Sequence, residues 1–211
     1  MTYTKPMANE YSALAYPIGE NLYLNITNRC TNQCVFCIRN KCQQLNQKYP
    51  LWLEHEPSEK EILDAIKNPT KHQQIVFCGY GEPLIRLETV INIAKELKKN
   101  NIPIRINTNG QANLFWGRNI LPELKGLVDY LSISLNSSDQ DHYEKLCHPT
   151  LGKSAYPAIL EFIKEAKKYI PNVEISIVDL PSTDKLKCQE IAKEIGVQLR
   201  IRPYYEETYM R

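Results

Sequence analysis

Three cysteines, Cys30, Cys34 and Cys37, stand at the spacing C-x3-C-x2-C directly after an apolar run at residues 21–27. Thiolates prefer soft metals, and closely spaced cysteines hold iron–sulfur clusters. Three such ligands would leave one iron of a four-iron cluster without a protein thiolate. An iron with a free coordination position can bind a small molecule, so the missing fourth cysteine favours chemistry over plain electron transfer.

Two plainer interpretations of this spacing stay open. Cysteines at positions i, i+4 and i+7 also line one face of a helix, where free cysteine packs as a small apolar side chain. Zinc is the other alternative, because cysteines at such spacings often bind it. No second cysteine or histidine pair is suitably spaced for a zinc site. The spacing by itself therefore indicates a metal centre and leaves the metal open.

The chain has seven cysteines, and an odd number with three close together favours metal binding over disulfides in a reducing cytosol. The other four, Cys42, Cys78, Cys147 and Cys188, are scattered, so we predict one cluster only. Cys188 stands at helical spacing with apolar residues and is predicted to be core. Cys78 ends a predicted strand and is a candidate hydrogen-atom donor, with simple packing as the favoured alternative. Cys42 is near enough to exchange as a ligand, and the roles of Cys42 and Cys147 stay open.

Length and composition predict a soluble globular protein with a single domain. The 211 residues carry a formal charge of +2, with no polybasic tail and no acidic block, so composition argues neither for nor against nucleic acid as a partner. Residues 1–19 contain no apolar segment of signal-peptide or membrane-spanning length, which predicts a cytoplasmic protein. We expect an N-terminal extension at residues 1–20, a core domain at 21–204 and a tail at 205–211.

Apolar runs typical of strands alternate with amphipathic runs typical of helices along the chain, which indicates a parallel sheet with helical crossovers. Six such repeats predict a partial (β/α)6 TIM-like barrel with parallel strands in a single domain. Ligands should then gather at the carboxyl ends of the strands. The predicted strands are residues 21–27, 74–78, 104–107, 130–136, 173–180 and 197–201, and the predicted helices begin at Ser58 or span residues 87–99, 120–127, 156–169 and 184–195.

Polar and glycine-rich motifs repeatedly follow these predicted strands. Taken singly, each motif is best explained as an ordinary turn or a surface group. Together they would share one rim of the barrel, and this pattern predicts a single site. The motifs are the cysteine loop, Gly79-Tyr80-Gly81-Glu82-Pro83, Asn107-Thr108-Asn109-Gly110, Ser134-Leu135-Asn136 and Arg202-Pro203-Tyr204.

The combination of C-x3-C-x2-C, an aromatic residue before the last cysteine, Gly-Glu-Pro and Thr-Asn-Gly resembles the radical S-adenosylmethionine (SAM) enzymes, over residues 21–204. Within that superfamily, the chain looks most like the small proteins associated with TatD-family hydrolases, a subgroup with no activity to transfer. The residues that carry this closer likeness are Tyr16-Pro17, 22–39, Leu51-Trp52-Leu53, 77–83, Ala112-Asn113-Leu114, Gly117-Arg118-Asn119 and Arg202-Pro203-Tyr204.

The resemblance implies that Cys30, Cys34 and Cys37 ligate three irons of one [4Fe-4S] cluster, while SAM chelates the fourth. Reductive cleavage of SAM would give methionine and a 5'-deoxyadenosyl radical, chemistry that the cofactor carries and the protein positions. Gly79 and Gly81 would let the backbone approach the methionine end. The remaining implied cofactor contacts are Tyr80, which replaces the commoner glycine, Glu82 to the amino group or as a brace, Asn109, Ser134 and Asn136 to ribose or carboxylate, and Val178, Asp179, Phe36 and Tyr204 around adenine.

The substrate is predicted only as a class. Residues 38–57 and 111–119 are the longest segments outside the repeats and are expected to shape its pocket. A small molecule, for example a nucleotide-like one, or a short peptide fits better than a long nucleic acid. The leading hypothesis is hydrogen abstraction from such a molecule, with flavodoxin or ferredoxin as electron donor; a glycyl-radical activase acting on a partner protein is second, and a non-enzymatic redox sensor is third. The substrate candidates are Arg39, Asn40, Trp52, Asn113, Arg118 and Arg202.

Overall fold

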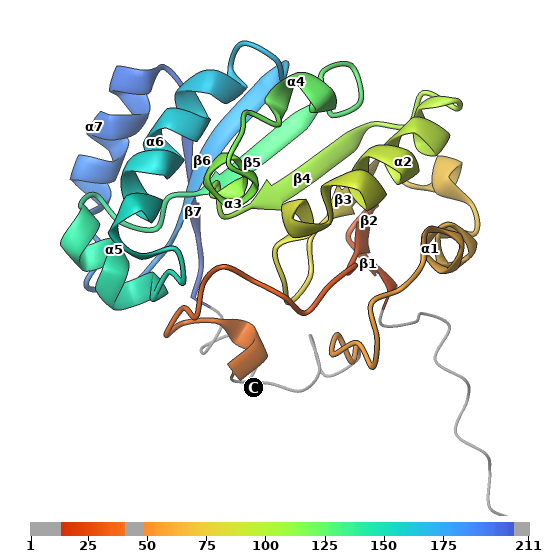
Figure 1. Cartoon of the computed structure of the whole chain (residues 1–211), viewed down its shortest axis with the longest axis horizontal. Helices are drawn as coiled ribbons and strands as arrows, with labels where there is room; N and C mark the ends of the chain where they lie inside the picture. The colour runs from red at the N-terminus through yellow and green to blue at the C-terminus, as the bar shows by residue number, and fades with distance from the viewer. Residues whose placement is uncertain (1–13, 41–48, 205–211) are drawn as a thin grey trace, which may run out of the picture.

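The computed structural model describes residues 14–40 and 49–204 of the chain. Within these residues the strands form one sheet of seven, ordered β1 to β7 along the chain (Figure 1). β2 to β7 run parallel, and β1 pairs antiparallel with β2. The strands are β1 (Ala15–Ile18), β2 (Asn21–Leu24), β3 (Gln74–Phe77), β4 (Ile104–Thr108), β5 (Tyr130–Ser134), β6 (Asn172–Val178) and β7 (Gln198–Arg202).

The helices connect successive parallel strands and form an arc along one side of the sheet in Figure 1. This order confirms the predicted α/β domain with a partial TIM-like barrel of six parallel strands. The α-helices are α1 (Glu59–Ile66), α2 (Leu87–Lys98), α3 (Ala112–Trp116), α4 (Leu121–Leu124), α5 (Gln140–Cys147), α6 (Ala155–Ala166) and α7 (Lys185–Ile195), with short 3-10 turns η1 (Ile38–Asn40), η2 (Pro69–Lys71), η3 (Pro83–Arg86) and η4 (Gly152–Ser154).

Alternation along the strands gives the sheet two unlike faces. Ile104 and Ile106 on β4 are fully buried beneath the helices, as are their counterparts on the neighbouring strands. Arg105 and Asn107, between and after them, point to the opposite face. The in-register neighbours that share this second face are largely polar: Ser132 and Ser134 on β5, Glu174 and Ser176 on β6, and Arg200 and Arg202 on β7.

Strand β1 was not predicted, because residues 15–18 fall in the expected N-terminal extension. It contains Pro17, which cannot donate a hydrogen bond and is tolerated in sheets at an edge position. β1 is one of the two edge strands of the described sheet. Its Tyr16 is buried with Tyr49, Leu51 and Tyr80, so this edge carries a small aromatic cluster of its own.

Local signals account for the helix ends. Ser58 and Glu61 form the capping box that begins α1, as the predicted serine start requires. The helix predicted at residues 120–127 is shorter, since α4 ends at Leu124. Helix α5 was not predicted; Asp139 caps it, and only Tyr143, Leu146 and Cys147 of its residues are buried.

Candidate functional site

The cysteine loop follows β2, and its shape is fixed by backbone hydrogen bonds rather than by regular structure. The N–H of Cys37 donates to the carbonyl of Cys34 at 3.0 Å. Arg39, a predicted substrate residue, instead donates to the carbonyls of Asn28 at 3.2 Å and Asn32 at 3.3 Å. The Arg39 side chain therefore links two backbone carbonyls of the cysteine loop. Cys42 lies outside the described residues.

The loop after β3 packs so closely against the cysteine loop that two of its positions require glycine. A Cβ on Gly81 would lie 2.4 Å from the carbonyl oxygens of both Thr27 and Arg29. A Cβ on Gly79 would lie 1.9 Å from Oδ1 of Asn25. Glycine is therefore needed at both positions so that this loop can pack against the segment around the cysteines, whose own atoms fill the space beside each Cα.

Glu82 joins three segments through one buried carboxylate. Its N–H donates to the carbonyl of Arg29 at 2.8 Å. Its side chain accepts from the N–H of Leu84 at 3.0 Å, the hydroxyl of Thr108 at 2.8 Å and the N–H of Asn109 at 2.6 Å. Burial raises the pKa of Glu82 to about 7, although these hydrogen bonds favour the charged form. Glu82 was predicted either to contact the amino group of SAM or to brace the loop. The hydrogen bonds that its side chain accepts are those of a brace.

Asn109, which follows β4, contacts the cysteine loop through its side-chain amide. Its Nδ2 donates to the hydroxyl of Thr31 at 2.7 Å and lies 3.9 Å from Sγ of Cys30. A buried amide and phenol network lies alongside it: Nδ2 of Asn32 donates to the hydroxyl of Tyr143 at 2.9 Å, and Nε2 of Gln111 donates to Oδ1 of Asn32 at 2.7 Å. The cysteine loop, β4 and α5 are therefore tied together.

Two of the three thiols hold their protons tightly in this environment. Burial, helped by the nearby Glu82 carboxylate, raises the pKa of Cys30 to about 12. A hydrogen bond with Cys147, together with burial, raises the pKa of Cys34 well above its usual range. Metal ligands must be deprotonated, so binding a cation here would release protons and be favoured at higher pH.

The carboxyl ends of β5 to β7 supply further polar groups. Nη2 of Arg202 donates to the hydroxyl of Ser134 at 3.5 Å, which brings two predicted residues together. Asn136 has a left-handed backbone, with φ of 58°, and is buried. Within the described part of the chain, its Oδ1 has no hydrogen-bonding partner. A buried acceptor without a partner is unusual and points to a ligand donor.

The residues predicted to contact adenine differ in burial. Val178 is buried in the main core, and both Phe36 and Tyr204 are half-buried against it. Asp179 is exposed, forms an ion pair with Lys185 and donates its N–H to the carbonyl of Arg202 at 2.8 Å. The backbone of Asp179 thus links the ends of β6 and β7.

Two of the predicted substrate residues form hydrogen bonds or ion pairs within the protein. Oδ1 of Asn113 accepts from the N–H of Ile120 at 3.0 Å, and Arg118 pairs with Glu123, so both stabilise the turn between α3 and α4. Asn40 ends η1 and is exposed. Trp52 is 61% exposed, with its ring centroid 6.4 Å from that of Tyr80.

Sequence reasoning missed the groups that support the cysteine loop from behind, namely Asn32, Gln111, Tyr143 and Cys147. Asn32 lies inside the cysteine motif and Gln111 directly follows Thr-Asn-Gly. Their proximity to these motifs is the sequence feature that could have identified them. Tyr143 and Cys147 belong to the unpredicted α5. Cys78 is half-buried, and its side chain hydrogen-bonds Asn107.

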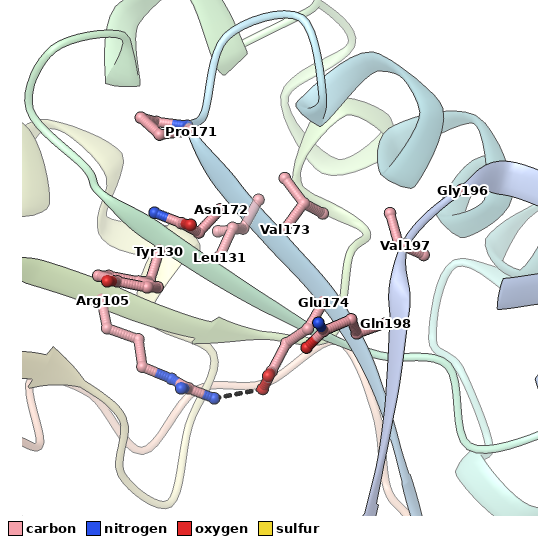
Figure 2. A pocket seen from close by; sticks show the side chains of 10 residues that line it. All are labelled: Arg105, Tyr130, Leu131, Pro171, Asn172, Val173, Glu174, Gly196, Val197 and Gln198. Carbon is pink, nitrogen blue, oxygen red and sulfur yellow. Dashed lines mark hydrogen bonds and ion pairs between the residues drawn. The ribbon is translucent and has the colours of Figure 1, made fainter. Parts of the chain in front are cut away.

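The polar face of the sheet extends from the carboxyl ends of the strands, where the site lies, to their amino ends. Arg105 and Glu174 form the ion pair that is drawn as a dashed line in Figure 2. Nη2 of Arg105 lies 2.5 Å from Oε1 of Glu174, and the hydroxyl of Ser132 donates to the same oxygen at 2.7 Å. A hollow of about 530 Å³ begins there and extends to Tyr130 and Asn172, at the starts of β5 and β6. It lies at the opposite end of these strands from the cysteine loop.

Residues 24–195, more than half of the chain, match the profile of the radical SAM superfamily. The chain belongs to the radical SAM superfamily. It is accordingly an enzyme of this class, and the family implies a [4Fe-4S] cluster and SAM.

Among curated relatives, a probable GTP 3',8-cyclase of Thermococcus kodakarensis is 28% identical over 79% of this chain and 50% of its own length. A putative glycyl-radical enzyme activating enzyme of Methanocaldococcus jannaschii is 27% identical over 79% of this chain and 65% of its own length. The chain spans about half the length of most of the curated relatives it matches. Their whole activities therefore do not transfer directly.

Solved structures of low identity share the fold. Streptococcus suis SuiB bound to its precursor peptide SuiA superposes with a TM-score of 0.62 at 16% identity, over 93% of this chain and 42% of that one. Methylornithine synthase gives a TM-score of 0.55 at 16% identity, over 87% of this chain and 53% of that one. Both support the partial-barrel architecture.

The residues present fit the implied groups. Three cysteines, a loop that only glycine permits and a buried Asn136 acceptor lie at the carboxyl ends of the parallel strands. Among the described residues, no three His, Cys, Asp or Glu side chains converge as ligands to a single ion. A four-iron cluster makes a different demand, since each cysteine binds a different iron. In the same part of the chain, no helix is long and apolar enough to span a membrane.

Proposed function

We propose that this chain abstracts a hydrogen atom from a small anionic substrate, with Cys30, Cys34 and Cys37 holding a [4Fe-4S] cluster. When bound, cluster and SAM supply an electron and a 5'-deoxyadenosyl radical. The single observation that carries the proposal is the hydrogen-bonded unit of cysteine loop, Glu82 and Asn109. It brings three motifs from distant parts of the sequence into one buried arrangement.

Each group of residues in this proposal has a physical task. The two glycines, Gly79 and Gly81, let the loop after β3 pack against the segment around the cysteines, and the family resemblance supports contact between the backbone of this loop and the methionine end of SAM. Oδ1 of Asn136 accepts a hydrogen bond from a ribose hydroxyl. Tyr80, Ser134, Val178, Asp179, Phe36 and Tyr204 remain proposed contacts on the strength of the family resemblance, as does Cys78 as a hydrogen-atom donor.

The polar face of the sheet is the proposed substrate surface. Arg105 and Arg200 both form ion pairs with Glu174 on this face, and Arg202 lies two residues beyond Arg200 on the same strand. Arg202 is the arginine at the carboxyl end of its strand, next to Ser134, where the radical would be formed. An anionic group on the substrate would be held there by charge-assisted hydrogen bonds. The likeness to GTP 3',8-cyclases supports a nucleotide-like molecule.

A second candidate is a glycyl-radical activase, which the 27% identical relative from Methanocaldococcus jannaschii favours. Flavodoxin or ferredoxin is the proposed electron donor in either case. The closer likeness to TatD-associated proteins, the cytoplasmic location and the boundaries at residues 20 and 204 also remain proposals.

Fractionation of a cell extract separates the two candidates. The reconstituted enzyme with SAM and dithionite would be incubated with filtrate molecules that an anion exchanger retains, with those that it does not retain, or with the protein fraction. We expect the retained small molecules to stimulate 5'-deoxyadenosine formation, and Arg202→Gln to lose that stimulation while Arg118→Gln keeps it. Stimulation by the protein fraction alone, with a glycyl radical signal, would favour the activase.

A further inference from the structure

Trp52 is held in an exposed position by the residues on either side of it. Its neighbours Leu51 and Leu53 are 2% and 6% exposed, whereas Trp52 is 61% exposed. Nδ2 of Asn25 donates to the carbonyl of Leu51 at 2.5 Å. The side chain of Asn28 donates to the carbonyl of Leu53 at 2.8 Å and accepts from its N–H at 3.2 Å. The fold therefore fixes the backbone on both sides of the exposed indole.

The position of Trp52 relative to the loop after β3 is fixed as well. The buried Asn25 amide that holds Leu51 also accepts, through Oδ1, a hydrogen bond from the N–H of Tyr80 at 3.2 Å. The ring of Tyr80 lies 6.4 Å from that of Trp52, measured between centroids. One buried side chain therefore places the exposed indole beside the loop that is proposed to contact SAM.

These aromatic residues belong to the same face of the sheet as the arginines. Tyr16, which shares a buried cluster with Tyr80, is in register with Tyr23 on β2. Tyr23 is in register with Val76, and Val76 with Arg105. Paired residues of neighbouring strands project to the same face. A substrate on this face would thus meet aromatic groups near β1 to β3 and arginines on β4 and β7.

The chain contains two tryptophans, and they are used differently. Nε1 of Trp116 donates to the carbonyl of Leu84 at 2.9 Å, which gives that indole a place within the fold. Within residues 14–40 and 49–204, the indole N–H of Trp52 has no acceptor. Tryptophan offers a large flat surface on which planar rings stack. The exposed, fixed indole of Trp52 is therefore suited to a planar ligand ring.

We infer that Trp52 is a specificity-determining residue that stacks on a planar heteroaromatic ring of the substrate. The inference rests on the proposed function and narrows its substrate class to molecules that carry both such a ring and an anionic group. The ring lies at Trp52 and the anionic group at Arg202, toward opposite edges of one face. Loss of a stacking side chain lowers the affinity for a base by roughly 5- to 150-fold.

The test uses the reconstituted full chain with SAM and dithionite, and the filtrate molecules that an anion exchanger retains as the probe. Activated charcoal divides this probe into adsorbed molecules, which contain planar rings, and molecules that pass through. We expect the adsorbed molecules, after elution, to stimulate 5'-deoxyadenosine formation. Trp52→Ala should raise the amount that gives half-maximal stimulation at least about fivefold, whereas Trp52→Phe should stay within about twofold of wild type.

Phe115→Ala is the matched control. Phe115 is 39% exposed and, like Trp52, contacts a second aromatic ring, with a centroid distance of 5.4 Å to Trp116. It belongs to α3, away from the loop after β3, so its removal should leave the half-maximal amount at the wild-type value. A similar rise in Phe115→Ala and Trp52→Ala would overturn the inference.

Equilibrium dialysis of labelled SAM adds a readout that does not depend on turnover. The Kd for SAM should be the same in Trp52→Ala and wild type, because the indole contacts the substrate ring rather than adenine. A raised Kd, stimulation only by molecules that pass through charcoal, or a wild-type response in Trp52→Ala would overturn the inference. Absence of stimulation by every small-molecule fraction would instead reject the proposed function itself.

Discussion

The backbone N–H of Asn109 donates a 2.6 Å hydrogen bond to Oε2 of Glu82, which joins the loop after β4 to the loop after β3. The same carboxylate accepts from Thr108, while the N–H of Glu82 donates to Arg29 beside the first cysteine. One buried acidic residue therefore sets the relative position of three motifs.

The free energy of unfolding should depend on Glu82 between about pH 4.5 and pH 7. Its pKa rises from 4.5 to about 7 on folding because of burial, so the folded state keeps a proton that the unfolded chain has released. The contribution of this group therefore falls as pH rises through that window, by about 3 kcal/mol in all. Denaturant unfolding of the cluster-free protein measures it. Glu82→Gln should lack this slope, and an unchanged slope would contradict the raised pKa.

Gly81→Ala should distort the cysteine loop. The new Cβ would meet two backbone carbonyl oxygens at 2.4 Å, so the backbone itself must move. We expect a loss of about 1–3 kcal/mol in unfolding free energy, typical of overpacking, and a marked fall in iron bound per chain. Gly126→Ala is the control, because it has φ of 76° with nothing within 4 Å and suffers only backbone strain. Equal iron content in the two variants would argue against the close approach.

Arg39→Gln should weaken cluster retention. The guanidinium holds two carbonyls of the cysteine loop, at 3.2 and 3.3 Å, and glutamine cannot span both. Each lost hydrogen bond from a charged group should cost about 1.5–3 kcal/mol of loop stability. Iron release to a chelator would be faster than in wild type, while Arg118→Gln, which disrupts an exposed ion pair, should release iron at the wild-type rate. Equal rates for Arg39→Gln and wild type would return Arg39 to the list of substrate candidates.

Asn136→Gly should weaken SAM binding without loss of stability. Glycine keeps the left-handed backbone, and the substitution removes a buried acceptor that the described residues leave unpaired. One hydrogen bond corresponds to a rise of about fivefold in the Kd for SAM. Equilibrium dialysis of labelled SAM against reconstituted protein measures this change. An unaltered Kd would remove Asn136 from the cofactor site.

Periodicity was sufficient to predict the parallel strands, whose ends from residue 74 onward differ from the structure by at most two residues. It failed for β1, because Pro17 breaks the strand pattern at an edge where proline is allowed. It also failed for α5, whose exposed residues are polar and whose buried face is only three residues.

The site was predictable where residue type itself restricts chemistry, as for the cysteines and glycines. The supporting contacts were not, since the bonds from Tyr143 and Cys147 to the cysteine loop join residues more than a hundred positions apart. Asn113 and Arg118 were plausible substrate groups by composition alone. The turn between α3 and α4 uses both, and only the folded chain reveals that use.

Anaerobic reconstitution followed by dithionite and SAM tests the central claim most directly, with 5'-deoxyadenosine as the measured product. Wild type and Cys188→Val should both form it, whereas Cys34→Ala should bind little iron and form none. The account is contradicted if wild type with full iron and sulfide content yields no 5'-deoxyadenosine, or if Cys34→Ala still cleaves SAM.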